Sequence, residues 1–209
     1  MGGTDHQIAA VLFDFGGVLL QHTDGIDHAA IESRLELAPG TLRRCLYSQS
    51  RYAEAFVGAC TTDEWLASVR AAMERLAGEK AAALYRAFQE VKHPLNPDVI
   101  ELVGRLRPRY KTGVISNTIP GLAPRLRNEF GIAEMFDVLV GSGDLRVAKP
   151  DAAIYLYAAA ELGLAPERCL FIDDAEPLAQ GARAVGMRAL RFTSCPQLVA
   201  DLRSAGVQW

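Results

Sequence analysis

Residues 8–18 read IAAVLFDFGGV, an apolar run that ends in a carboxylate and two glycines. The run from Ile8 to Phe13 is short and rich in aliphatic side chains, which is typical of a strand buried on both faces of a parallel sheet. Asp14 follows directly, at the carboxyl end of this predicted strand. Open parallel sheets bind ligands at that edge, so the position of Asp14 indicates a functional site.

Four later runs repeat the strand pattern and alternate with helical patterns. They are predicted at residues 113–115, 136–140, 168–172 and 187–192. One intervening helix is expected to begin with Asn96 as N-cap and Pro97 at its first position. Alternation of strands and helices predicts an α/β fold, here a Rossmann-like three-layer parallel sheet.

Between residues 20 and 93 helical periodicity replaces the strand pattern. A capping box formed by Thr61 and Glu64 begins the clearest helix. Its apolar stripe is Trp65, Val69, Ala72, Met73 and Leu76. We predict that residues 20–93 form a helical cap inserted after the first strand, over its carboxyl end. Residues 1–19 and 94–209 would then form the catalytic core.

Composition narrows the classes of partner. The formal net charge is −3, with no cationic excess for nucleic acid or an anionic membrane surface. The apolar stretch from Ile8 to Leu20 is too short to span a bilayer and contains Asp14. The 4 cysteines lack zinc-ligand spacing and are interpreted as reduced and structural. We expect a cytoplasmic protein with a small-molecule partner, and both monomer and dimer remain open.

Polar residues also mark other strand ends. Ser116 and Asn117 follow the second strand, Lys149 precedes a helix, and Asp173-Asp174 ends a further strand. With Asp14, these carboxylates would repel one another at a low-dielectric edge unless a cation compensated them. Oxygen ligands without histidine or thiolate favour Mg²⁺, which often takes a phosphate oxygen as a further ligand. The pattern therefore predicts magnesium and a phosphorylated substrate.

Taken in chain order, Asp14, Ser116, Lys149 and the Asp173-Asp174 pair resemble the motifs of the haloacid dehalogenase-like superfamily, in the branch with a helical cap after the first strand. The resemblance spans the whole chain. It implies a magnesium-dependent phosphatase that hydrolyses a small phosphorylated metabolite. Asp14 would attack phosphorus and form an aspartyl-phosphate that water then releases.

The resemblance also implies roles for individual residues. Asp14 and Lys149 would be catalytic, with Lys149 neutralising Asp14 and the charge that develops on the phosphoryl group. The metal would be bound by Asp14, the carbonyl of Gly16, Asp174 and Asp173. Asp174 is the preferred direct ligand, while Asp173 would hold a metal-bound water or Lys149. Phosphate would be bound by Ser116, Asn117 and Lys149, with nearby backbone N–H groups.

Gly16 departs from the family pattern. Phosphatases of this family usually have a second aspartate at that position as general acid and base, a function worth about 10² to 10⁴ in rate. Its absence predicts substrates with good leaving groups, unless a cap residue supplies the proton. The candidates for that role are His22, Asp24 and His28, and the candidates for substrate specificity are His22, Arg51 and Tyr52. Solvated cap surface is the commoner role of such residues.

Two alternative functions remain open. A 2-haloacid dehalogenase would use the same aspartate without a metal, and Gly16 suits it, but uncompensated carboxylates at 173 and 174 would repel its substrate. A phosphate-ligand-binding protein with little turnover would also explain the missing acid. Taken singly, Ser116 has the alternative role of a helix cap and Lys149 that of a solvated lysine, but the functional roles are favoured for both.

Overall fold

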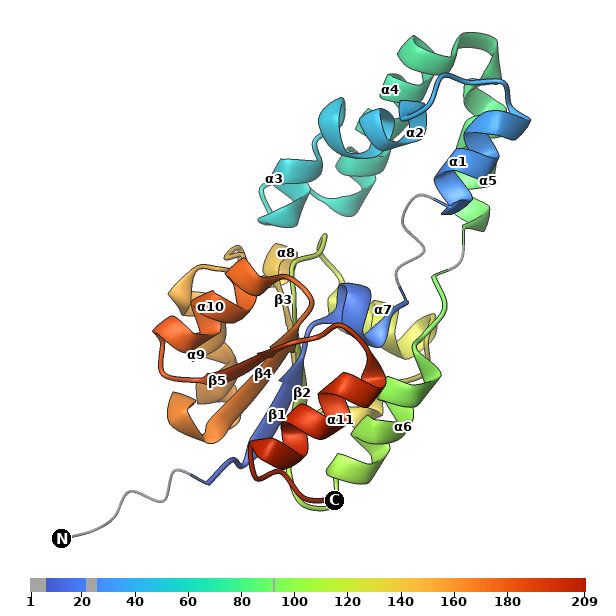
Figure 1. Cartoon of the computed structure of the whole chain (residues 1–209). Helices are drawn as coiled ribbons and strands as arrows, with labels where there is room; N and C mark the ends of the chain where they lie inside the picture. The colour runs from blue at the N-terminus through green and yellow to red at the C-terminus, as the bar shows by residue number, and fades with distance from the viewer. Residues whose placement is uncertain (1–6, 22–25, 92) are drawn as a thin grey trace, which may run out of the picture.

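The computed structural model describes residues 7–21, 26–91 and 93–209. Within them lies a five-stranded parallel sheet with the strand order β3-β2-β1-β4-β5 (Figure 1). The strands are β1 (Ala10–Phe13), β2 (Lys111–Ser116), β3 (Val138–Gly141), β4 (Cys169–Asp173) and β5 (Arg188–Arg191). Each predicted strand is present, which confirms the Rossmann-like fold.

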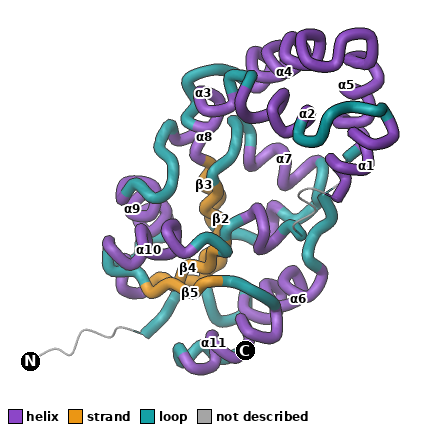
Figure 2. The backbone as a smooth tube through the Cα atoms, turned by 45° about the horizontal axis from the view of Figure 1, so that its top comes forward, coloured by secondary structure: helices purple, strands orange, loops and turns teal. Residues whose placement is uncertain are grey.

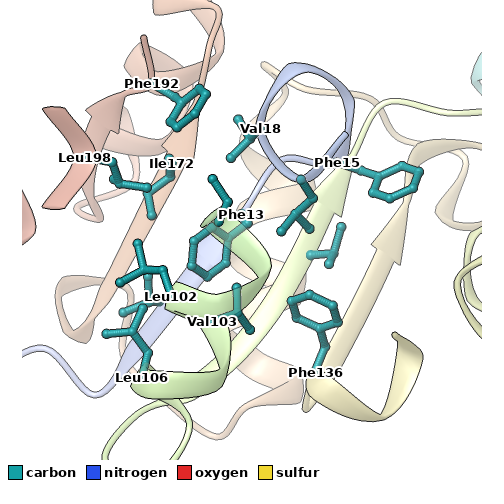
Figure 3. Packing of buried hydrophobic residues seen from close by; sticks show 14 of the residues in the cluster. Phe13, Phe15, Val18, Leu102, Val103, Leu106, Phe136, Ile172, Phe192 and Leu198 are labelled. Atoms are coloured by element: carbon teal, nitrogen blue, oxygen red, sulfur yellow. The ribbon is translucent and has the colours of Figure 1, made fainter. Parts of the chain in front are cut away.

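Helices cover both faces of the sheet, because successive strand residues point to opposite sides. Val11 and Phe13 pack in one apolar cluster, and Ala10 and Leu12 in the other. The first cluster includes residues of α6 (Pro97–Leu106), α7 (Leu122–Asn128) and α11 (Cys195–Ser204). The second includes residues of α9 (Ala152–Glu161) and α10 (Glu176–Ala184). Figure 3 shows Phe13 packed beside the α6 side chains of the first cluster.

The remaining core elements are short. They are α8 (Ser142–Leu145) and the helical turns Phe15–Leu19, Ala133–Met135 and Pro166–Arg168. Asn96 precedes α6 as expected, but its side chain makes no capping hydrogen bond. All four cysteines are free, as predicted. Within the described ranges, no helix combines the length and apolarity needed to cross a membrane.

Strand β1 is the centre of the sheet, with β2 on one side and β4 on the other. Phe13 pairs with both Val114 and Ile172, so the three strands end at one level. The chain moves outward from β1 in both directions, which makes this edge the switch point where parallel sheets bind ligands. Asp14 and Asp173 each come directly after one of these paired residues.

Helices α1–α5 form a separate bundle beyond the carboxyl ends of the strands (Figures 1 and 2). They are α1 (Ile26–Arg34), α2 (Thr41–Arg43), α3 (Tyr52–Phe56), α4 (Thr62–Ala77) and α5 (Ala81–Glu90), with helical turns at Arg44–Ser48 and Gly78–Lys80. The predicted capping box is present, since Thr61 Oγ1 accepts from Glu64 N and Glu64 accepts from Thr61 N. Four stripe residues are buried in the bundle core, whereas Leu76, near the end of α4, is 37% exposed.

The bundle contacts the core at two places. At one, Leu20 and Leu95 form an antiparallel bridge, beside the domain limits predicted at residues 20 and 93. At the other, Ser142 Oγ donates to the carbonyl of Phe56 at 2.6 Å. Gly58 lies there with φ +63°, and a Cβ on it would come within 2.2 Å of a backbone oxygen of α8. The exact domain limits stay a prediction.

Candidate functional site

Lys149 joins two carboxylates at the carboxyl edge of the sheet. Its Nζ lies 2.9 Å from Asp14 Oδ1 and 2.6 Å from Asp173 Oδ2. The Lys149 and Asp173 side chains are fully buried, and that of Asp14 is 11% exposed. Lys149 is therefore enclosed by the site and is not a solvated surface lysine.

The protonation of Asp14 depends on this enclosure. Burial raises the pKa of Asp14 from 3.8 to about 6, since the ionised form is desolvated. The Lys149 ammonium lowers the pKa of Asp14, and the nearby Asp173 carboxylate raises it. Lys149, with a smaller contribution from the backbone N–H of Phe15, thus favours an ionised, nucleophilic Asp14.

Asp174 joins Asp14 and Asp173 in a carboxylate cluster, with ligand oxygens of all three within 4.8 Å of one another. Three carboxylates and one ammonium leave two negative charges in a buried place. A divalent cation would neutralise them, and an all-oxygen donor set suits Mg²⁺. The residues present therefore fit the predicted metal.

The two aspartates of the pair differ in their surroundings. Asp173 Oδ2 binds Lys149, and Asp173 Oδ1 accepts from Ala175 N at 2.9 Å. Both of its oxygens are thus engaged within the protein. Asp174 is partly exposed. This supports Asp173 as the residue that holds Lys149, while Asp174 as the direct metal ligand stays a prediction.

Asn117 fixes the backbone of Lys149. Its Nδ2 donates to the Lys149 carbonyl at 2.9 Å, and its Oδ1 accepts from the Lys149 N–H at 2.7 Å. The side chain of Asn117 therefore positions Lys149, and one N–H of its amide group is left for a further contact. Ser116 ends β2 and is 3% exposed. Phosphate binding by both residues stays a prediction.

Gly16 and Gly17 form the turn after Asp14. Gly17 has φ 77°, a conformation that favours glycine, whereas Gly16 has φ −72° and ψ 127°, which other residues adopt readily. A Cβ built on Gly16 meets nothing within 4 Å. Lack of space therefore does not explain why position 16 carries no acidic side chain.

A cavity of about 440 Å³ lies between the core and the cap at this edge. On the core side Gly16, Gly17, Ser116 and Asn117 line it, and on the cap side Tyr47, Tyr52, Trp65 and Phe88. His93, Arg125 and Glu129 also line it, although they belong to no motif that would have identified them from the sequence. Their place in the cavity depends on how the cap packs on the core, which the spacing of residues along the sequence does not reveal.

The predicted cap residues have different surroundings. Tyr52 lines the cavity, whereas Arg51 is not among its lining residues and pairs with Glu54 at 2.5 Å. His28 lines a second cavity within the cap, apart from the one beside Gly16. His22 and Asp24 lie outside the described residues. The roles proposed for these residues in acid catalysis or specificity stay predictions.

Several curated phosphatases are similar to this chain in sequence. Phosphatase MT3486 of Mycobacterium tuberculosis is 30% identical over 161 residues, 73% of each protein. A phosphoglycolate phosphatase of Salmonella typhi is 27% identical over 209 residues, 89% of this chain and 81% of that protein. A phosphoserine phosphatase of Thermus thermophilus is 29% identical over 127 residues, 58% of this chain. The chain spans about half (51%) of the length of that last relative.

Solved structures share the fold. A HAD family enzyme of Bacteroides thetaiotaomicron, in complex with magnesium and inorganic phosphate, has a TM-score of 0.69 at 19% identity, covering 89% of this chain and 94% of that one. The L-2-haloacid dehalogenase of Xanthobacter autotrophicus has a TM-score of 0.61 at 21% identity, covering 97% and 85%. A family model, described as haloacid dehalogenase-like hydrolase, matches residues 8–186. As its motifs predicted, this chain belongs to the haloacid dehalogenase-like hydrolase family.

Proposed function

We propose that this protein is a magnesium-dependent phosphatase that hydrolyses a small phosphorylated metabolite through an aspartyl-phosphate on Asp14. The observation that carries the proposal is the contact of Lys149 Nζ with both Asp14 and Asp173, with Asp174 in the same carboxylate cluster. The phosphatases named among its relatives support the same reaction class.

Each step follows from the surroundings of Asp14. Its carboxylate attacks phosphorus, and the ester P–O bond breaks with its electron pair on the departing oxygen. Water then attacks the aspartyl-phosphate, which frees inorganic phosphate and restores Asp14. Lys149 keeps Asp14 ionised and offsets negative charge at the reacting phosphoryl group. Bound Mg²⁺ would supply the charge that offsets the carboxylate cluster and the phosphate.

The ligands in this proposal are Asp14, Asp174 and the carbonyl of Gly16, with Asp173 holding Lys149 in place. Ser116 and neighbouring backbone N–H groups would bind the phosphate oxygens. Gly16 has no side chain to protonate the leaving group, so substrates whose leaving group departs unprotonated should react fastest.

Gly16 also favours a second candidate, a 2-haloacid dehalogenase, and a dehalogenase shares this fold. That reaction needs a site that admits an anionic acid without a metal. Here Asp173 and Asp174 place additional negative charge beside Asp14, with a single lysine to offset it. The charge balance therefore supports the phosphatase.

The test uses acetyl phosphate and 4-nitrophenyl phosphate, with Mg²⁺ or with a chelator. We expect hydrolysis with Mg²⁺, loss with chelator, and loss in Asp14→Asn. Asp151→Asn is a matched control, because Asp151 is an exposed N-cap whose replacement keeps a capping oxygen. Turnover of 2-chloropropionate in chelator would indicate the dehalogenase instead. Phosphate binding without turnover would indicate a binding protein.

A further inference from the structure

The cap side of the cavity is a wall of aromatic rings. The Tyr52 ring lies 4.8 Å from that of Tyr47, 4.9 Å from that of Phe56 and 6.0 Å from that of Trp65, measured between centroids. Tyr47, Tyr52 and Trp65 line the cavity, and Phe88 of α5 extends the wall. The Tyr52 ring is tilted by 80°, 38° and 56° to these three neighbouring rings, so the wall offers both ring faces and ring edges, and an aromatic ligand can pack against either.

The charges in the cavity are already paired. Among the described residues that line it, Arg125 is the one permanent cation and Glu129 the one carboxylate. Arg125 Nε lies 3.3 Å from Glu129 Oε2, and the Arg125 guanidinium also lies 5.6 Å from the ring centroid of Phe15. Among the described lining residues, a carboxylate on the leaving group would therefore meet no permanent cation that is not already paired with Glu129.

The volume leaves room for a leaving group larger than a two-carbon acid. A cavity of about 440 Å³ falls within the range of about 300–1,000 Å³ that is usual for sites of drug-sized ligands. A two-carbon acid such as the leaving group of phosphoglycolate would leave most of the aromatic wall uncovered. Apolar surface left in contact with water contributes nothing to binding.

We propose that the leaving group of the substrate is uncharged and carries a planar aromatic ring, which stacks against the wall formed by Tyr47, Tyr52, Trp65 and Phe88. This inference rests on the proposed phosphatase function. It sets the protein apart from phosphatases of small phosphorylated acids. Asp14 takes the phosphoryl group, the ester P–O electron pair leaves with the aromatic alcohol, and solvent supplies the proton to that oxygen.

The experiment compares kcat and KM for three primary phosphate esters with similar leaving-group basicity. Benzyl phosphate carries the ring, cyclohexylmethyl phosphate replaces it with a saturated ring of similar size, and 4-carboxybenzyl phosphate adds a charge. We expect the KM of benzyl phosphate to be about three- to tenfold lower than that of the saturated ester. We expect a still higher KM for the carboxylated ester, and poor use of phosphoglycolate.

Substitutions of single tyrosines test which residue causes the preference for the aromatic ester. Tyr52→Leu should bring the KM ratio of the saturated and aromatic esters close to one. Tyr157→Leu is the control, because Tyr157 is a 42% exposed tyrosine of α9 that does not line the cavity, and its ratio should equal that of the wild type. The wild-type ratio decides the question on its own if Tyr52→Leu does not fold.

Different results would overturn the aromatic leaving group and the phosphatase function. Equal KM values for the aromatic and saturated esters, or a preference for 4-carboxybenzyl phosphate or phosphoglycolate, would overturn the inference about the leaving group. Hydrolysis of acetyl phosphate, lost in Asp14→Asn, would leave the phosphatase function standing in that case. Absence of turnover for acetyl phosphate and for every ester would overturn both.

Discussion

Replacing Gly16 with aspartate should place a general acid at the position where related phosphatases have one and this chain has glycine. The backbone of Gly16 is in an ordinary conformation, with φ −72° and ψ 127°, and a Cβ there meets nothing within 4 Å. The new carboxyl group would extend into the cavity that Gly16 already lines. The substitution is therefore compatible with the fold, unlike one at Gly17, where φ is 77°.

The size of the gain follows from the role of the added proton. General acid catalysis contributes about 10² to 10⁴ in rate, equivalent to about 3 to 5.5 kcal/mol of barrier. The new carboxylate also adds negative charge near Asp14, whose pKa burial has already raised to about 6. We therefore expect the lower end, about 10²-fold in kcat for alkyl phosphates. Aryl phosphates should change little, because their leaving groups depart without a proton.

The assay compares kcat for benzyl phosphate and 4-nitrophenyl phosphate in the wild type, Gly16→Asp and Gly16→Asn. Asparagine has the same size as aspartate but cannot donate a carboxyl proton, so Gly16→Asn should show no gain. An equal gain in both variants would refute the acid role. So would an equal gain on both substrates in Gly16→Asp.

Three further predictions concern the residues around Asp14. Mg²⁺ at one hundred times its Kd should stabilise the wild type by about 2.7 kcal/mol in thermal unfolding. Asp174→Asn should lose this stabilisation, whereas Asp151→Asn should keep it. An unchanged response in Asp174→Asn would exclude Asp174 as a ligand. Burial raises the pKa of Asp14 from 3.8 to about 6, so the stability that the protonated group contributes is full below pH 3.8 and is lost as pH rises through 6. In metal-free protein, Asp14→Asn should therefore raise the free energy of unfolding more at pH 8 than at pH 4, by at most about 3 kcal/mol, and urea titrations showing the reverse order would contradict this sign. Asn117→Ala removes both hydrogen bonds to the Lys149 backbone, so we expect a loss of about 1–3 kcal/mol in stability together with a fall in kcat; unchanged kcat would show that Lys149 is positioned by other contacts.

The sequence was sufficient to predict the sheet and the residues at its edge. A strand in a parallel sheet is a short apolar run, and its end is marked by the first polar residue. Asp14 and Asp173 are such residues, and they meet because Phe13 and Ile172 pair in the sheet. Lys149 was predicted from its motif, and its burial between the two carboxylates agrees with that position.

Other parts of the site depend on contacts that no local pattern records. The bond between Asn117 and the Lys149 backbone joins two loops that are 32 residues apart. The pairing of Arg125 with Glu129 has ordinary helical spacing and gives no sign that both line the cavity. The position of Tyr52 in the aromatic wall is set by how the cap helices pack, which hydrophobic periodicity alone does not fix.

The second contact between cap and core, where Phe56 meets Ser142, affects how molecules enter and leave the site. The polar links there are the Ser142–Phe56 hydrogen bond and that from Thr62 Oγ1 to the Pro120 carbonyl at 3.2 Å. Each is worth about 1 kcal/mol, and Ile119 of the core also packs against the apolar cluster of the cap, so separation of this side has to break these contacts while the linkers at Leu20 and Leu95 stay paired. Molecules would then enter and leave on the Ser142 side, with the paired linkers acting as the pivot. A bulky side chain in place of Gly58 would hold this entrance ajar, admitting water to the aspartyl-phosphate before its leaving group has departed from the cavity.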